Sequence, residues 1–309
     1  MEINYVELHE VGPREGFQFE GIGQPGKISS AQKVELVEAL AQTGLRKIQV
    51  TSFVSSKQVP QMADADEVSK QIQRFPGVVY DAIYLNDKGL ERAIAARIYQ
   101  IDGHISLTAS ETFSKLNQHR DMAADIAMQR KQLALYAEHG IPVRSGTLMA
   151  AFGCSYEGDI SQERVVECIG IMCELAGESG DKLEGVLLAD TMGWADPEQI
   201  KRVIGAIRDR WPSLSVSLHL HDTRGLGIAN VYAAMQVGVT AFDSSIGGLG
   251  GCPFARSASG NVATEDIVFM CSRMGVETGV DLEGLLEVVR LAEQIVGHPL
   301  PGKLGHAST

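Results

Sequence analysis

The sequence predicts an α/β protein, a (β/α)8 TIM barrel with an additional C-terminal helical segment. Short apolar or β-branched runs alternate with segments of helical periodicity, which predicts parallel strands joined by crossover helices. Eight such units close into a barrel. No linker, low-complexity tract or short repeat interrupts the alternation. A doubly wound open sheet is the structural alternative that the pattern alone leaves open.

The predicted elements can be read directly from the printed sequence. The strands are Val6–Val11, Lys47–Ser52, Val78–Tyr84, Gly103–Thr108, Val143–Ala150, Gly185–Ala189, Ser215–Leu220 and Ala241–Ile246. Clear helices are Ala31–Gln42, Asp125–His139, Glu163–Gly177, Pro197–Arg210 and Asn230–Val237. Glycines that follow four of these helices fit the left-handed residue expected at a helix C-terminus: Gly44, Gly140, Gly180 and Gly238.

Length and composition fit one soluble catalytic domain. We expect it to span residues 1–309, with the barrel at about 4–279 and the helical extension at about 280–309. A hydrophobic fraction of 44% is sufficient for a large core. The net charge of -12, without any basic run, argues against a nucleic-acid partner. It does not argue against an anionic substrate, which a local cluster of arginines and lysines can bind.

Cysteine usage and the absence of targeting signals predict a cytoplasmic protein. The five cysteines are odd in number and contain no CxxC pair, which favours reduced thiols over a disulfide framework. The N-terminus has no basic segment followed by an apolar stretch, so no secretory signal is expected. No window of 18 apolar residues occurs, so no membrane span or membrane partner is expected.

Reactive groups in such barrels come from the C-terminal ends of the strands, and three segments fall there. The first is Val11–Gln18, with the sequence VGPREGFQ, which places the cation of Arg14 and the carboxylate of Glu15 at the barrel mouth. A structural ion pair is the alternative interpretation of these two residues.

The second segment carries two histidines, His219 and His221, in the sequence HLHD. Side chains two residues apart on a strand point to the same face, so both imidazoles can reach one ion. This pattern favours a divalent metal over two packed core histidines. Mg²⁺, Mn²⁺ and Zn²⁺ all remain compatible with such ligands.

The third segment is a glycine-rich loop, Ile246–Phe254, with four glycines within Gly247–Gly251. The loop carries Cys252, and Asn261 follows it with an amide oxygen that can bind a metal. A phosphate cradle with an incidental cysteine is the alternative, but the segment matches neither the P-loop nor the GxGxxG pattern. Cys168 and Cys173 lie in a predicted helix and are interpreted as packing residues.

With these residues in place, the sequence resembles the 3-hydroxy-3-methylglutaryl-CoA lyase family, within the wider group that includes isopropylmalate and homocitrate synthases. The likeness runs from about Val6 to Gly279 in unbroken order. The matching stretches are VGPREGFQ, TSFVSSKQVPQM, ASETFSKLN, GCSYEG, ADTMG, HLHDTRG, GGLGGCPFA and ASGNVATED. The GGLGGCPFA element is specific to the lyases.

The resemblance implies a divalent metal, Mg²⁺ or Mn²⁺ with Zn²⁺ as the alternative, and coenzyme A as part of the substrate. It implies that the metal ligands are Glu15, His219, His221 and Asn261. The implied catalytic residues are Arg14, which would stabilise the enolate of acetyl-CoA, Cys252, which would protonate it, Asp190, which would relay the hydroxyl proton, and His219. Arg14, Gln18, Gln49 and Arg224 are the candidate substrate-binding residues. A homodimer is also implied.

The chemistry of a retro-Claisen cleavage agrees independently with this set. The substrate hydroxyl must lose a proton, and chelation to a divalent cation lowers its pKa by several units. Negative charge then develops on the thioester oxygen, where a guanidinium can stabilise it. The resulting carbanion needs a proton from an acid with a pKa of about 7 to 9, which suits a thiol.

Three positions differ from the pattern of these lyases. Glu15 replaces an aspartate, Gln49 replaces a glutamate, and Arg224 replaces an uncharged residue. These differences leave the reaction class intact and affect the choice of substrate acid. Arg224 is a candidate partner for the distal carboxylate, with a solvated arginine at a helix start as the alternative.

The leading functional hypothesis is cleavage of 3-hydroxy-3-methylglutaryl-CoA to acetyl-CoA and acetoacetate. The alternative is a sister lyase for another branched 3-hydroxyacyl-CoA, such as citramalyl-CoA, which would give acetyl-CoA and pyruvate. A synthase is less favoured, because those chains carry a C-terminal regulatory extension and this one stops at Thr309. A non-enzymatic binding module is disfavoured, because all four proposed ligands and Cys252 are retained.

Overall fold

Within the part of the chain that the structure describes, eight strands alternate with helices, and two further short strands form a hairpin. The structure is a computed structural model, and it describes residues 3–20, 28–250 and 260–307. Among these eight strands, each pair whose register is described is parallel. The α/β class is therefore confirmed. The chain divides into two compact units, a central unit (Asp102–Ala241) and an N/C unit formed by Glu2–Ile101 and Phe242–Thr309. Closure of the strands into one barrel stays a prediction.

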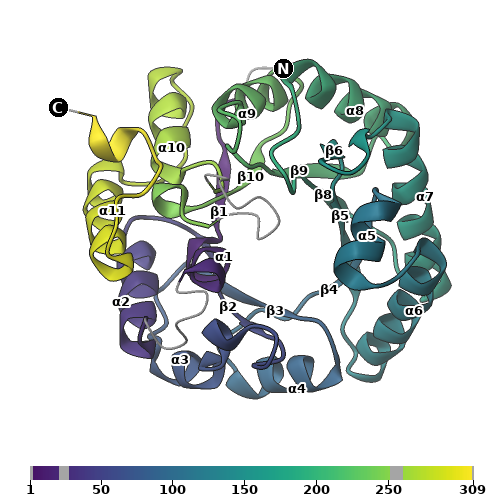
Figure 1. The fold of residues 1–309 in the computed structure, drawn as a ribbon, viewed down its shortest axis with the longest axis horizontal. Coiled ribbons are helices and arrows are strands. Elements are labelled where there is room, and N and C mark those ends of the chain that lie inside the picture. The colour runs from purple at the N-terminus through teal and green to yellow at the C-terminus, as the bar shows by residue number, and fades with distance from the viewer. Residues whose placement is uncertain (1–2, 21–27, 251–259, 308–309) are drawn as a thin grey trace. The chain divides into compact units, whose positions relative to one another are not determined.

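The central unit is a sheet with the strand order β9-β8-β5-β4. The strands are β4 (Gly103–Thr108), β5 (Val143–Met149), β8 (Gly185–Ala189) and β9 (Ser215–His219). A hairpin, β6 (Gly153–Cys154) and β7 (Gly158–Asp159), follows β5. The helices are α5 (Glu111–Gln118), α6 (Met122–Glu138), α7 (Gln162–Glu178), α8 (Pro197–Arg210) and α9 (Gly227–Gln236). Helices α6 to α9 follow one another along the sheet, each beside the next (Figure 1).

The N/C unit is a sheet with the strand order β3-β2-β1-β10. The strands are β1 (Glu7–Glu10), β2 (Lys47–Phe53), β3 (Val79–Tyr84) and β10 (Ala241–Ser244), whose first residue lies at the unit boundary. The helices are α1 (Gly12–Phe19), α2 (Ser30–Ala41), α3 (Ala65–Gln71), α4 (Asp87–Ala96), α10 (Thr264–Arg273) and α11 (Leu282–Val296). Short 3₁₀ turns are η1 (Pro60–Met62), η2 (Ile246–Gly248) and η3 (Leu304–His306). Among the described helices, none is long and apolar enough to cross a membrane.

Local sequence signals explain where the helices begin and end. Ser29 caps α2 in a reciprocal capping box with Gln32, and Asp196 caps α8 just before Pro197. The bounds of β4, β8 and α8 match the predicted ones. The four glycines predicted to end helices have positive φ angles, between 65° and 91°. This prediction is therefore confirmed.

The first strand ends earlier than the sequence pattern indicated. β1 stops at Glu10, and the chain turns at once into α1, so Arg14, Glu15 and Gln18 lie on a helix rather than at a strand end. Pro13 occupies the first turn, where its missing amide proton costs no hydrogen bond. The segment therefore follows the first strand directly, as predicted, but forms a helix there.

A half-buried histidine lies between two carboxylates in the N/C unit. His9 on β1 contacts Asp243 on β10 through Nδ1 at 3.0 Å and Asp81 on β3 through Nε2 at 3.2 Å. Lys47 lies 3.7 Å from the Asp81 carboxylate. Burial alone would lower the pKa of His9, but the charges of Asp81 and Asp243 outweigh it and raise the pKa to about 9. His9 is therefore a half-buried cation at neutral pH.

We expect this cation to make the free energy of unfolding fall as pH rises from about 6.5 to about 9. The pKa is raised in the folded protein, so the stabilisation is complete below the unfolded value of 6.5 and is lost as pH passes through the folded value of about 9. The shift corresponds to about 3 kcal/mol at most. Urea unfolding at about pH 6 and about pH 9.5 measures it in the wild type and in His9→Gln.

The variant should be less stable at the lower pH and should lose less stability between the two pH values. Because other buried carboxyl groups titrate in the same range, the difference between the two proteins isolates the contribution of His9. An identical pH dependence in both proteins would contradict the assignment of a charged His9.

Candidate functional site

The central unit places three polar side chains at neighbouring strand ends. β8 and β9 are adjacent, and Ala189 pairs with His219 at the last position of both strands. His219 and His221 are both buried, and their Nε2 atoms lie 3.1 Å apart. The prediction that these histidines face the same side is therefore confirmed. Two imidazole nitrogens in this position can share a cation or a proton.

Asp190 follows β8 directly and is fully buried beside these histidines. Its Oδ1 accepts a hydrogen bond from the amide of Trp194 at 2.6 Å, and its Oδ2 accepts one from the amide of Ala195 at 3.1 Å. Burial raises the pKa of Asp190 above its ordinary value, although the two amides and the nearby histidines oppose this shift. Both carboxylate oxygens are therefore oriented by the turn that follows the strand.

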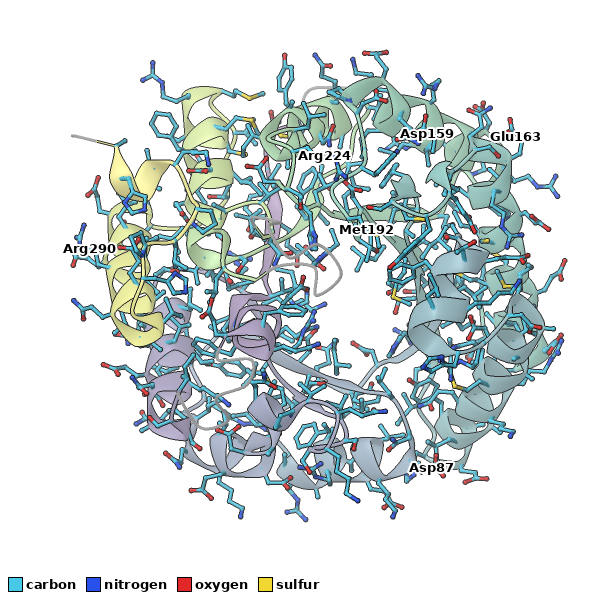
Figure 2. All side chains as sticks on the ribbon, viewed as in Figure 1. Asp87, Asp159, Glu163, Met192, Arg224 and Arg290 are labelled. Carbon is cyan, nitrogen blue, oxygen red and sulfur yellow. The ribbon has the colours of Figure 1, made fainter. Side chains whose placement is uncertain are left out.

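Arg224 holds that same turn from the next loop of the central unit. Its Nη1 donates to the carbonyl oxygens of Met192 at 2.6 Å and Gly193 at 3.0 Å. Figure 2 labels the side chains of Arg224 and Met192. The Arg224 Cζ lies 4.8 Å from the centre of the Trp194 ring, in a cation–π arrangement. The Trp194 Nε1 donates in turn to Asp159 Oδ1 at 2.6 Å. Although its side chain is exposed, Arg224 makes three specific contacts and is not merely solvated.

The N/C unit carries the arginine and the carboxylate on α1. Arg14 Nε donates to Gln49 Oε1 on β2 at 2.5 Å, and Arg14 Nη2 lies 3.0 Å from Glu15 Oε2. Glu15 is buried, and Gln18 lies half-buried one turn further along the helix. The guanidinium is thus fixed by one neutral and one anionic partner.

Asn261 presents a buried amide oxygen that has no hydrogen-bond partner among the described residues. Its Nδ2 donates to the carbonyl of Leu249 at 3.1 Å, while its buried Oδ1 has no hydrogen bond within the described residues. A Cβ added to Gly250, whose φ is +109°, would lie 2.8 Å from Asn261 Nδ2 and 3.4 Å from Glu15 Cγ. Only glycine therefore permits Asn261 and Glu15 to approach this backbone from both sides. A buried orphan oxygen of this kind suits a cation.

A buried glutamate that the sequence analysis missed supports this part of the site. Glu10 accepts hydrogen bonds from the amides of Gly12 at 2.8 Å and Ile246 at 2.9 Å, and from Thr264 Oγ1 at 2.6 Å. Burial raises its pKa to about 7 despite these bonds, and burial likewise raises the pKa of Glu265 to about 8. Glu10 joins the start of α1 to the segments after β10. Its one sequence signal was its place at the end of the predicted strand Val6–Val11, beside the strand end where functional groups were expected.

The structure assembles the predicted residues in two groups, one in each unit. The central unit brings together Asp190, His219 and His221, with Arg224 on the adjoining loop, and the N/C unit brings together Arg14, Glu15, Gln49 and Asn261. Cys252 lies outside the described residues. The assembly of the two groups into one site stays a prediction.

The described cysteines fit packing roles. Cys168 on α7 and Cys271 on α10 are buried, and burial raises the pKa of each thiol to about 11. Cys173 is partly buried, and its pKa is also raised by burial. A thiol with a raised pKa is a weak nucleophile and a weak acid near neutral pH.

Comparisons with known proteins agree with these observations. The HMGL-like family model matches residues 5–292. The chain is 39% identical over 298 residues to hydroxymethylglutaryl-CoA lyase YngG of Bacillus subtilis, covering 96% of this chain and 95% of that protein. Its structure is similar to the crystal structure of the Bacillus subtilis HMG-CoA lyase, with a TM-score of 0.87, 37% identity and coverage of 99% and 98% of the two chains.

A second solved structure is also similar over nearly its whole length. It is an HMG-CoA lyase of Acinetobacter baumannii in complex with coenzyme A and 3-methylmalate, with a TM-score of 0.85, 35% identity and coverage of 99% of this chain and 95% of that chain. These similarities confirm the family resemblance that the sequence motifs indicated.

Proposed function

The chain belongs to the HMGL-like family, and from that premise we propose that it cleaves 3-hydroxy-3-methylglutaryl-CoA to acetyl-CoA and acetoacetate in a reaction that requires a divalent metal. The enzyme is a carbon–carbon lyase. The observation that carries the proposal is the pair of histidine Nε2 atoms, 3.1 Å apart at the ends of parallel strands beside a buried aspartate. This arrangement suits a metal-assisted reaction at a hydroxyl group.

The donor set fits a divalent cation. Two imidazole nitrogens, the buried carboxylate of Glu15 and the orphan oxygen of Asn261 are ligands that Mg²⁺ or Mn²⁺ accepts, with Zn²⁺ as the alternative. We infer that Glu15, His219, His221 and Asn261 together hold this ion. A bound divalent cation supplies Lewis acidity that makes the substrate hydroxyl easier to deprotonate.

The residues of the chain would then divide the remaining work. Asp190, oriented by two backbone amides, accepts the hydroxyl proton. The carbon–carbon bond breaks, the hydroxyl carbon becomes the ketone of acetoacetate, and the electron pair passes to the acetyl-CoA enolate. Arg14, fixed by Gln49 and Glu15, stabilises the charge on the thioester oxygen. Cys252 donates the proton that completes acetyl-CoA.

Gln49 favours a second candidate substrate. The Gln49 amide that binds Arg14 is neutral, so Glu15 is the one anionic contact of the guanidinium among the described residues. The site therefore carries less negative charge than it would with a glutamate at position 49. Such a site suits a substrate acid of different size or charge, such as citramalyl-CoA, which would give acetyl-CoA and pyruvate. The acyl-CoA substrate class is the same in both cases. A homodimer in the cytoplasm completes the proposal.

Release of acetyl-CoA from a panel of 3-hydroxyacyl-CoA thioesters tests this function. With 3-hydroxy-3-methylglutaryl-CoA we expect kcat/KM above about 10⁴ M⁻¹s⁻¹, in the ordinary range of enzymes. Failure to release acetyl-CoA from any thioester in the presence of Mg²⁺, Mn²⁺ or Zn²⁺ would refute the proposal.

The double variant Glu15→Asp, Gln49→Glu separates the two substrates. If these residues select the acid, the ratio of kcat/KM values should shift toward 3-hydroxy-3-methylglutaryl-CoA, relative to citramalyl-CoA, by a factor of about 10–200. Gln42→Glu is the matched control, because Gln42 is exposed at the end of α2 and its change should leave the ratio unaltered. A double variant with lower activity and an unaltered ratio would show that these residues do not set specificity.

A further inference from the structure

The turn after β8 is held by contacts from the hairpin that precedes it and from the loop that follows it, all within the central unit. Trp194, in this turn, donates from Nε1 to Asp159 at 2.6 Å on the hairpin β6–β7. Its ring packs so closely on the hairpin that a Cβ added to Gly153 would lie 2.2 Å from Trp194 Cδ1. A contact of that length is far inside van der Waals distance, so the tryptophan lies directly on the hairpin backbone.

The loop after β9 holds the same turn from its other side. A Cβ added to Gly193, whose φ is +60°, would lie 2.8 Å from Thr223 Cβ, so the two loops are in direct contact. Arg224, the next residue, reaches back to the carbonyl oxygens of Met192 and Gly193 and stacks on Trp194. A charged donor shared by two carbonyls makes hydrogen bonds about twice as strong as neutral ones.

The same turn orients the aspartate of the site. The amides of Trp194 and Ala195 bind the two oxygens of Asp190. Arg224 binds the carbonyls of Met192 and Gly193, and the Gly193 carbonyl belongs to the same peptide unit as the Trp194 amide. Because peptide units are planar, a guanidinium that fixes the carbonyl of Gly193 also fixes the amide of Trp194. The contacts therefore form a continuous path from Arg224 to the Asp190 carboxylate.

We propose that Arg224 is a positioning residue for the lyase reaction: it locks the turn of residues 192–195 so that the backbone amides hold Asp190 in its productive orientation. The proposal rests on the proposed function for its catalytic consequence, but the lock itself is a property of the central unit. It gives Arg224 a role through Asp190, in place of the direct binding of the substrate's distal carboxylate that the sequence suggested.

The consequence is a loss in the chemical step rather than in substrate affinity. Without Arg224, the Asp190 side chain stays at the end of β8, but its carboxylate samples more orientations. Misplacement of an acid–base group by a fraction of an ångström costs catalysis while leaving the contacts of the thioester with the protein unchanged. We expect Arg224→Met to lower kcat about tenfold and to change KM by less than about twofold.

The test compares Arg224→Met, Arg224→Lys and Arg144→Met in a Trp211→Phe background. The chain has two tryptophans, so this background leaves Trp194 as the one emitting indole. Arg224→Lys retains a cation that can reach a carbonyl and should recover part of kcat. Arg144 is the matched control, because it forms an exposed ion pair with Glu184 in the same unit at 3.7 Å.

Three readouts are needed: kcat and KM, Trp194 emission, and hydrogen exchange at the amides of Trp194 and Ala195. In Arg224→Met we expect altered Trp194 emission and exchange about tenfold faster at both amides, with no change in Arg144→Met. Unchanged exchange and emission would overturn the lock. A rise in KM with kcat preserved would instead identify Arg224 as a substrate ligand and overturn the proposal.

Faster exchange without any loss of kcat would also overturn it, because the lock would then have no catalytic consequence. If the wild type cleaves no acyl-CoA, the proposed function fails by itself. Exchange and emission then still decide whether Arg224 holds the turn.

Discussion

Replacing His219 or His221 with alanine is expected to abolish both divalent-metal binding and turnover while the chain stays folded. The two Nε2 atoms lie 3.1 Å apart, so removal of either ring removes one of two adjacent donors. If the cation supplies several kcal/mol of transition-state stabilisation, its loss lowers the rate by about 10³-fold or more. Metal content by mass spectrometry, circular dichroism and acetyl-CoA release measure the three properties.

His139→Ala is the matched control, because His139 lies exposed at the end of α6 and should retain both metal and activity. Exhaustive chelation of the wild type should reproduce the effect of the histidine variants. Added Mg²⁺ or Mn²⁺ should then restore the activity of the wild type but not that of the variants. Full activity in a sample shown to contain no metal would disprove the metal-dependent mechanism.

Arg14→Met is expected to lower kcat by about 10²–10³, the cost of removing one preorganised donor from a developing oxyanion. Arg14 is fixed before the reaction by Gln49 at 2.5 Å and Glu15 at 3.0 Å, so it needs little reorganisation when charge appears on the thioester oxygen. Methionine retains much of the side-chain volume and removes the charge. Steady-state kinetics with the preferred thioester should therefore show a fall in kcat that is much larger than any rise in KM.

Arg290→Met controls for the general effect of losing an arginine. Arg290 is exposed on α11 (Figure 2), and it forms an ion pair with Glu287. This variant should keep wild-type kinetics, because exposed ion pairs contribute little. A change confined to KM in Arg14→Met would show that Arg14 anchors the substrate in the ground state and does not stabilise the enolate.

The sequence predicted those parts of the fold that depend on local periodicity. Strand and helix bounds such as β4, β8 and α8 follow from residue patterns within single segments. The facing of His219 and His221 also follows from a local rule, the alternation of side chains along a strand. The helix α1 was missed, because Gly12 and Pro13 are typical of a turn and the helix depends partly on the distant Ile246 and Thr264 that share Glu10.

Contacts between loops were also beyond what the sequence could predict. Nothing in the spacing of Arg224, Trp194 and Asp159 indicates that their side chains meet, since they lie in three loops joined by long helices. The sequence identified Arg224 as unusual and offered two roles for it. The hydrogen bonds from Arg224 Nη1 to the carbonyl oxygens of Met192 and Gly193 are the physical basis for a third role, the positioning of Asp190.

The division of the chain into two units has a consequence for the order of events during synthesis. The central unit is continuous, Asp102–Ala241, and all of it is made by the time translation passes Ala241, the first residue of β10. The N/C unit joins the first hundred residues to the last segment, and the buried Glu10 bonds to Ile246 and Thr264 across that gap. On the ribosome, His219 and Asp190 can therefore reach their final surroundings within the central unit while Glu10 still lacks its partners Ile246 and Thr264.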